Sequence, residues 1–175
     1  IQAPNVAEFE LRRYLEGKVP KLVIPQSGAE WKVEAEQIRK HLLHEVIFHG
    51  WPREWVEAGS KAEDMGLLPE PPDKTYRLRK IRYEIVPGFQ STAILYEPQH
   101  LTGKVPAVLN VNGHVGPIGK AIDYKQKRCI NYAKRGIIAL NLEWIGYGEL
   151  KSPENNHDFA AHLDLTGISG VGLFY

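Results

Sequence analysis

Residues 105–116, VPAVLNVNGHVG, are the stretch that decides the fold. Residues 107–111, AVLNV, are apolar except for Asn110 and predict a strand buried on both faces, as in a parallel sheet. The run ends in Asn112-Gly113-His114, where Gly113 permits backbone angles that are closed to other residues. Peptide N–H groups of such a turn can point into a cleft beyond the strand's carboxyl end. The turn is a candidate anion-binding or oxyanion-binding loop, although Asn-Gly is also typical of an ordinary turn.

A helix and a second buried strand follow this turn. Residues 122–135 carry apolar side chains at roughly helical spacing, and Gly136 stands where a helix C-terminal cap is expected. Residues 137–142, IIALNL, predict a strand, so residues 105–142 form a βαβ unit with a right-handed connection. This strand ends in EWIGYGE, another glycine-rich loop, at residues 143–149. We therefore expect both loops at the same edge of a sheet.

An antiparallel hairpin precedes the βαβ unit. Residues 76–86, YRLRKIRYEIV, alternate apolar and charged side chains, and the chain turns at Pro87-Gly88 and returns over residues 91–96. Pro-Gly suits the central positions of a type II turn, and the alternation indicates one solvated face. The predicted fold class is α/β, in which an antiparallel hairpin is followed by a βαβ unit.

The N-terminal region predicts helices. Residues 27–30, SGAE, have the pattern of a capping box, and an amphipathic helix follows that should end near His49-Gly50. The proline-rich stretch LPEPPD at residues 68–73 separates this region from the hairpin. We divide the chain into an N-terminal helical appendage at residues 1–67 and an α/β domain at residues 74–175.

Composition excludes several classes of function. The 22 basic and 21 acidic residues give no electrostatic signature of nucleic-acid binding. No apolar stretch reaches membrane-spanning length. The single cysteine, Cys129, cannot form an internal disulfide and is expected to be a packed apolar residue in its helix.

Patterns that would bind a metal or a nucleotide are incomplete. His44 and His49 are five residues apart and lie on different helix faces, and His41 with His44 has no third ligand nearby, so we expect no metal and no cofactor. Residues 113–120, GHVGPIGK, depart from a phosphate-binding loop because Ala121 follows Lys120. We expect Lys120 to be solvated.

The order of elements and four segments carry a family resemblance. NGHVGPIGK, LEWIGYGE, HLDLTGISG and the N-terminal EWKVEAEQIRKHLLHEVIFHGWP resemble the acetyl-xylan-esterase-like branch of the α/β-hydrolase superfamily, over nearly the whole chain. In that family a serine on a nucleophile elbow attacks an ester, a histidine takes its proton, and a carboxylate orients the histidine. The resemblance implies that residues 74–175 are the N-terminal half of an α/β-hydrolase sheet.

The chain departs from the family at the nucleophile. The elbow G-x-S-x-G should open the helix after the fifth strand, with the acid and the histidine later, and the sequence contains no such elbow. Residues 167–171, GISGV, have valine in place of the second glycine and no apolar strand before them, and Ser169 is typical of a turn or a helix start. The nucleophile-elbow half is therefore missing from the predicted domain.

The resemblance implies that the chain supplies part of an oxyanion hole. The donor from the loop after the third hydrolase strand is, by position, the backbone N–H of His114, with Val115 as the alternative. Three glycines are expected beside the substrate: Gly113, Gly146 and Gly148. Glu143 is expected to fix its loop by hydrogen bonds. His157 belongs to a polar cluster that either is a surface loop or lines the acyl or alcohol pocket.

The resemblance also predicts the activity and the partners. In the intact protein we expect a serine carboxylesterase that hydrolyses an ester, with acetylated carbohydrate as the inherited substrate class, and we expect the isolated chain to be inactive. The family's strand order leaves one edge of the strand at residues 107–111 for a missing C-terminal half or a second chain. A noncatalytic binding or pseudoenzyme module is the alternative, and a nucleotide-binding α/β domain is a weaker one.

The resemblance is compatible with secretion or a periplasmic location. The chain begins at Ile1, so we expect processing or a fragment, with any signal peptide already removed.

Overall fold

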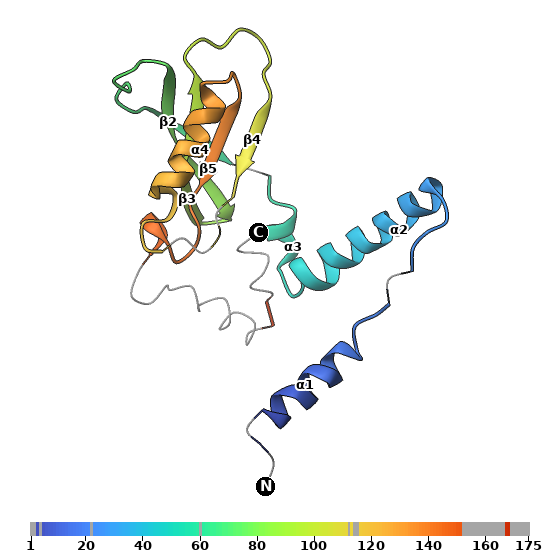
Figure 1. Cartoon of the computed structure of the whole chain (residues 1–175). Helices are drawn as coiled ribbons and strands as arrows, with labels where there is room; N and C mark the ends of the chain where they lie inside the picture. Colours follow the sequence, from blue (N-terminus) through green and yellow to red (C-terminus); the bar gives the residue numbers. More distant parts are fainter. Residues whose placement is uncertain are drawn as a thin grey trace. The chain divides into compact units, whose positions relative to one another are not determined.

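The computed structural model describes residues 3, 5–21, 23–59, 61–111, 113, 116–151, 167 and 168. The chain divides into two compact units, Ile1–His41 and Leu42–Tyr175. Figure 1 shows the elements of each unit along the chain. No helix among the described residues is long and apolar enough to cross a membrane.

The first unit contains two helices, α1 (Val6–Glu16) and α2 (Gly28–His41). The predicted capping box is present at the start of α2, where the Ser27 hydroxyl oxygen accepts the backbone N–H of Glu30 at 3.2 Å. The Glu30 carboxylate accepts the backbone N–H of Gln26 at 2.9 Å. Neither helix contains a buried residue.

The second unit opens with a short helical region. A π-helical turn, η1 (Leu42–Ile47), precedes α3 (Arg53–Val56). Phe48 and Trp51 meet edge to face with ring centroids 5.4 Å apart, and Trp51 meets Trp55 in the same way at 5.7 Å. These aromatic contacts stabilise the segment that connects η1 to α3.

A five-stranded mixed sheet forms the centre of the second unit. Its strand order is β1-β2-β3-β5-β4. The strands are β1 (Ala62–Leu67), β2 (Tyr76–Val86), β3 (Phe89–Pro98), β4 (Ala107–Asn110) and β5 (Ile138–Leu142). The predicted α/β fold class is thus confirmed.

The hairpin and the βαβ unit are where the sequence predicts them. β2 and β3 pair antiparallel, with Leu78 opposite Tyr96, and the turn between them has Gly88 at φ +84°. β4 and β5 pair parallel, with Leu109 opposite Leu140. The intervening helix is α4 (Asp123–Ala133).

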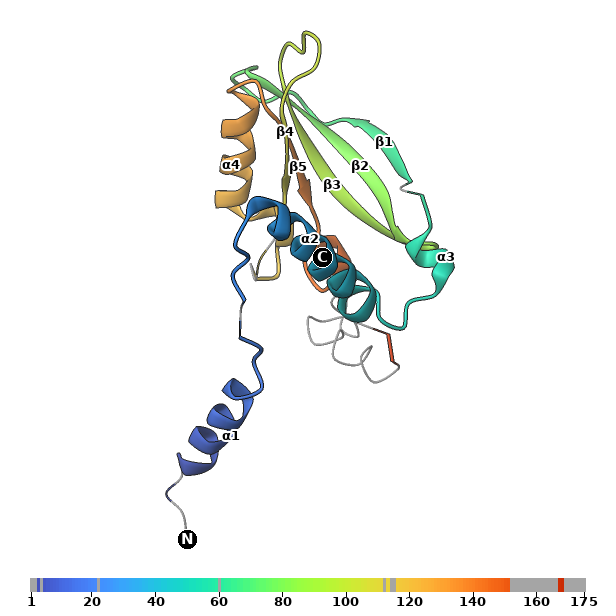
Figure 2. The same cartoon turned by 90° about the vertical axis from the view of Figure 1, so that its right-hand side faces the viewer.

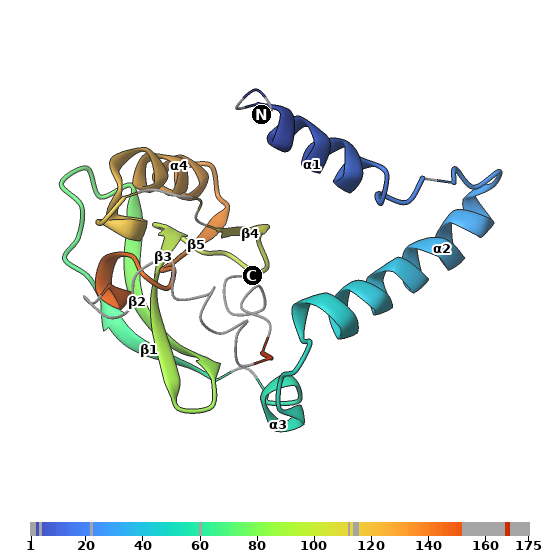
Figure 3. The ribbon, with the colours of Figure 1, turned by 90° about the horizontal axis from the view of Figure 1, so that it is seen from below.

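α4 covers one face of the sheet, as Figures 2 and 3 show. The core beneath it consists of Tyr96, Cys129, Ala133 and Ala139, with Leu78 and Ile94 packed against them. Cys129 is fully buried, and burial raises the pKa of its thiol to about 11. Cys129 therefore packs as a small apolar residue, as expected, because so little of its thiol ionises near neutral pH.

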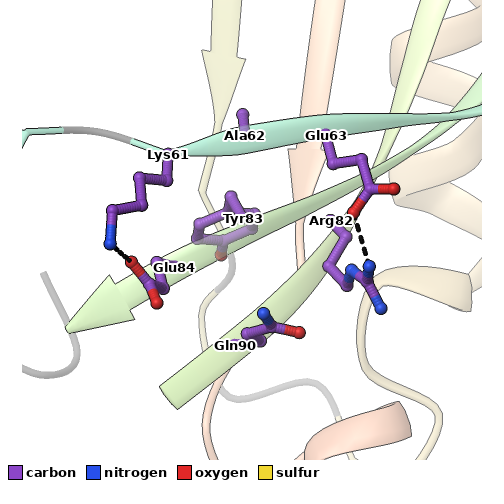
Figure 4. Close-up of a pocket in the computed structure, with 7 residues that line it drawn as sticks. All are labelled: Lys61, Ala62, Glu63, Arg82, Tyr83, Glu84 and Gln90. Carbon is purple, nitrogen blue, oxygen red and sulfur yellow. Dashed lines mark hydrogen bonds and ion pairs between the residues drawn. The ribbon is translucent and has the colours of Figure 1, made fainter. Parts of the chain in front are cut away.

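β1 lies in a stretch that the sequence assigns to the helical region at residues 1–67. It pairs antiparallel with β2, and salt bridges cross this pair, from Lys61 to Glu84 at 2.9 Å and from Arg82 to Glu63 (Figure 4). Residues 62–67 lack an alternating apolar pattern, so local sequence does not reveal a strand. The free backbone groups of β2 provide the hydrogen bonds that order it.

β4 is less buried than the sequence predicts. The strand was expected to be covered on both faces, but Ala107 is exposed and Leu109 is 58% exposed. Among the described strands, β4 is an edge and pairs only with β5. The two exposed side chains alternate along β4 with Val108, whose partner Ala139 belongs to the core under α4, so they lie on the opposite face of the sheet.

The core under α4 leaves little room for a larger side chain at Ala139. We expect Ala139→Leu to lower the free energy of unfolding by about 1–3 kcal/mol, because overpacking a filled core forces neighbours from their preferred rotamers. Urea denaturation of the chain measures this change. Leu109→Ala, at an exposed position, is the control and should change the free energy by about 0.5 kcal/mol or less. Equal effects of the two substitutions would contradict this description of the core.

Candidate functional site

Two loops meet at the carboxyl ends of β4 and β5. The first contains Gly113 and the 3₁₀ turn η2 (Gly119–Ala121), and the second contains the 3₁₀ turn η3 (Gly148–Leu150). Because β4 and β5 are parallel, both loops leave the same edge of the sheet. The backbone N–H of Gly148 donates to the carbonyl oxygen of Pro117 at 3.0 Å. The predicted proximity of the two loops is confirmed.

The Glu143 carboxylate joins the loops. Its Oε1 accepts the backbone N–H of Lys120 at 2.9 Å and that of Trp144 at 3.3 Å. Its Oε2 accepts a hydrogen bond from the Lys120 ammonium, Nζ, at 2.9 Å. The side chain of Glu143 is only 1% exposed and that of Lys120 is 9% exposed. The expectation that Glu143 fixes its loop by hydrogen bonds is therefore confirmed.

Two glycines make room for this carboxylate. Gly119 has φ +54° and Gly148 has φ +50°, a backbone region that other residues rarely adopt. A Cβ atom on either glycine would lie 2.0 Å from an oxygen of Glu143. Both the backbone angle and the space therefore require glycine at these two positions.

Two buried asparagines tie the strand ends to the first loop. The Asn110 side-chain amide donates to the side-chain oxygen of Asn141 at 2.9 Å, and the Asn141 amide donates to the backbone carbonyl of Lys120 at 3.0 Å. Asn110 ends β4 and Asn141 lies in β5. These hydrogen bonds fix the position of the first loop relative to β4 and β5.

The sequence predicts that Lys120 is solvated, but its side chain is buried. Its ammonium also donates to the Thr92 hydroxyl oxygen at 2.9 Å and forms a hydrogen-bonded ion pair with Glu149. Hydrogen bonds from Lys120 and from Thr92 lower the pKa of Glu149. The partners of the Lys120 ammonium are at least 23 residues away in the sequence, so no local pattern predicts that this side chain is buried.

Some predicted site residues can be placed and others cannot. Gly113 lies just beyond the end of β4, Gly146 has φ +81° and donates its N–H to the Leu150 carbonyl at 3.3 Å, and Gly148 contacts the first loop. The remaining candidates lie outside the described residues: His114, Val115, His157 and Ser169. The oxyanion and substrate-binding roles stay predictions.

The charged side chains of this site pair with each other, which indicates that they hold the loops in place. Lys120 neutralises Glu143, and both side chains are buried, so neither is placed for proton transfer to a ligand in solution. Within the described part of the chain, no group of three or more His, Cys, Asp or Glu side chains is arranged to hold a metal ion. The chemistry that the loops can support is binding through fixed backbone N–H groups.

Comparison with known proteins identifies the fold. No family model and no curated protein matches the sequence. A solved structure of a candidate acetyl xylan esterase from Bacteroides fragilis matches with a TM-score of 0.71 at 20% identity, over 95% of this chain and 46% of that chain. The chain thus has an esterase-like fold and spans less than half the length of that protein.

Two further solved structures match more weakly. An acetyl xylan esterase from Paenibacillus sp. R4 has a TM-score of 0.44 at 16% identity, over 82% of this chain and 38% of that chain. A cold-adapted esterase from an Arctic intertidal metagenomic library has a TM-score of 0.39 at 20% identity, over 55% of this chain and 40% of that chain.

The need for glycine at position 148, beside the ion pair of Glu143 and Lys120, can be tested with a matched pair of variants. Gly148→Ala should lower the free energy of unfolding by about 3 kcal/mol or more, because it displaces the carboxylate of a buried ion pair. Gly103→Ala is the control, since Gly103 has φ +75° but open space around its Cβ position. It should lose only about 1–2 kcal/mol, the cost of the backbone angle. Equal losses in urea denaturation would show that Glu143 does not constrain Gly148.

The ion pair of Glu149 predicts a pH dependence. Because its pKa is lowered on folding, Glu149 contributes stability that is present above the unfolded-state pKa of about 4.3 and is lost as pH falls through the folded-state pKa. The wild-type chain should therefore lose more stability between about pH 5 and about pH 3 than Glu149→Gln does. Urea denaturation at several pH values measures this difference, and parallel pH profiles would contradict it.

Proposed function

We propose that this chain is the loop-bearing part of a serine carboxylesterase. The proposal is based on the buried ion pair of Glu143 and Lys120, which holds the loop after β4 against the loop after β5 in an esterase-like fold. Acyl transfer needs hydrogen-bond donors that are fixed before the carbonyl oxygen gains charge, and one such donor contributes about 3 kcal/mol. A loop held by buried hydrogen bonds meets this need.

In this proposal the donor is the backbone N–H of His114, with that of Val115 as the alternative. Gly113, Gly146 and Gly148 border the substrate. At Gly113, where the Cβ position is open, the lack of a side chain lets the substrate approach the backbone. His157 lines the acyl or alcohol pocket. Support comes from the position of Gly113 directly after β4 and from the contact of Gly148 with the first loop.

The nucleophile, the histidine base and the acid come from outside this chain, either from a C-terminal half or from a second chain. The same part adds a strand beside β4, which is an edge of the described sheet. An ester of an acetylated carbohydrate is the substrate class suggested by the candidate acetyl xylan esterase of similar fold. No cofactor enters this reaction.

A noncatalytic binding module is the second candidate. It is favoured by the mutual neutralisation of Lys120 and Glu143. A nucleotide-binding role is disfavoured, because the Lys120 ammonium that would face a phosphate already donates to Thr92, Glu143 and Glu149.

Hydrolysis of p-nitrophenyl acetate separates these candidates. The intact protein should hydrolyse it, a serine-directed phosphonate should abolish the activity, and the isolated chain should be inactive. An intact protein with no hydrolysis, or with hydrolysis that the phosphonate leaves unchanged, would reject the serine esterase and favour the binding module.

Proline substitution tests the oxyanion donor in the intact protein. His114→Pro removes the backbone N–H and should lower kcat by about 10²–10³-fold with a smaller change in KM. His114→Ala keeps the N–H and is the matched control, and circular dichroism checks folding of both variants. If Val115→Pro alone lowers kcat, the donor is Val115, and if neither proline lowers it, the proposed oxyanion role is wrong.

A further inference from the structure

An apolar seam runs along α2 to the start of η1. Trp31, Ala35, Ile38 and Leu42 follow one another at the spacing of a heptad repeat, with Trp31 and Ile38 at d positions and Ala35 and Leu42 at a positions. Trp31 is 51% exposed, Ile38 45% and Leu42 46%, and α2 contains no buried residue. A seam of a and d positions alone is narrower than the apolar stripe of a helix on a globular core, and it is typical of a helix that pairs with another helix.

Charged residues of opposite sign flank this seam. Lys32 and Arg39 directly follow the two d residues and stand at e positions, whereas Glu34 stands at a g position on the other flank, as does His41. Within the described part of the chain, neither Glu34 nor Arg39 forms an ion pair. The other charged residues of α2 stand at b, c and f positions on its outer side: Glu30, Glu36 and Lys40. One flank of the seam is therefore basic and the other carries a carboxylate.

This charge pattern is complementary to a second copy of itself in one orientation. In a parallel pair of helices, a g residue of one helix lies beside the e residue five positions later on the other, so Glu34 faces Arg39 of the second copy, twice by symmetry. Ser27 faces Lys32 in the same way, so no like charges meet. In an antiparallel pair, e residues face e residues and Lys32 lies beside Arg39 of the second copy. Charge thus favours the parallel orientation.

We propose that α2 pairs in parallel with α2 of a second copy of this chain, through the seam of Trp31, Ala35, Ile38 and Leu42. The pairing ends after Leu42, because the π-helical turn η1 changes the angular spacing of the side chains that follow. Two heptads bury less surface than a standard interface, so we expect a weak dimer with a Kd on the order of 100 µM. The inference uses neither of the two loops and does not depend on esterase activity.

Sedimentation equilibrium of the full chain, from about 10 µM to about 500 µM at neutral pH, measures the association. Glu34→Arg places two like charges beside each other in the pair and should raise the Kd about tenfold, as should Arg39→Glu. An equal mixture of these two variants restores opposite charges on both flanks and should associate as tightly as the wild type. Glu36→Arg, on the outer side of α2, is the matched control and should leave the Kd unchanged.

Two outcomes of this measurement would overturn the proposal. A chain that stays monomeric up to about 500 µM would show that a second copy does not cover the seam and would leave it to another part of a longer protein. Association that Glu34→Arg and Arg39→Glu leave unchanged would show that a surface other than α2, such as the edge of β4, joins the copies. Circular dichroism checks that each variant folds.

Disulfide cross-linking tests the orientation. Gly28 lies one heptad before Ala35, with open space around its Cβ position, and Gly28→Cys should cross-link under mild oxidation because equivalent a residues face each other in a parallel pair. In an antiparallel pair centred on the seam, the two residues would be about 25 Å apart along the helix axis. Val33→Cys, on the outer side, is the control, and Cys129 does not compete because it is fully buried. No cross-link through position 28, or an equal one through position 33, would overturn the parallel pairing.

Discussion

The buried ion pair of Glu143 and Lys120 is the constraint on which the arrangement of the two loops depends. Both charges are removed from water, and each is satisfied by the other and by backbone or side-chain hydrogen bonds. Breaking such a pair leaves an uncompensated buried charge, at a cost of about 3–5 kcal/mol. Separation of the two loops therefore has a high cost in free energy. Gly119 and Gly148 follow from the same constraint, because any side chain there would occupy the space of the carboxylate.

Much of the fold could be predicted because its signals are local. The alternation at residues 76–86, the Pro87-Gly88 turn and the apolar run at residues 137–142 each depend on neighbouring residues, and the structure has the corresponding elements. β1 could not be predicted in this way. Its order comes from pairing with the free edge of β2, and a strand defined by its partner has no periodicity of its own.

The site was predictable only in part, for a similar reason. Glu143 was expected to hold its loop, and the meeting of two loops at one sheet edge follows from parallel strands. The partner was missed, because a lysine after a glycine-rich turn is usually solvated. Thr92 lies in β3 and the two glutamates lie in the loop after β5, so only the folded sheet brings them to Lys120. The sequence shows the charges and does not show which of them are buried together.

The main effect of the buried polar cluster is to set the geometry of the loops, and its contribution to the stability of the fold is small. A buried ion pair is often no more stabilising than a well-packed apolar pair of the same volume, so Lys120 and Glu143 are weak contributors to net stability. Their hydrogen bonds have directions, however, and an apolar pair would not set the backbone of Lys120 relative to Trp144. One ion pair thus fixes the position of the first loop and, by using every donor of the Lys120 ammonium, leaves that ammonium with no donor for a ligand.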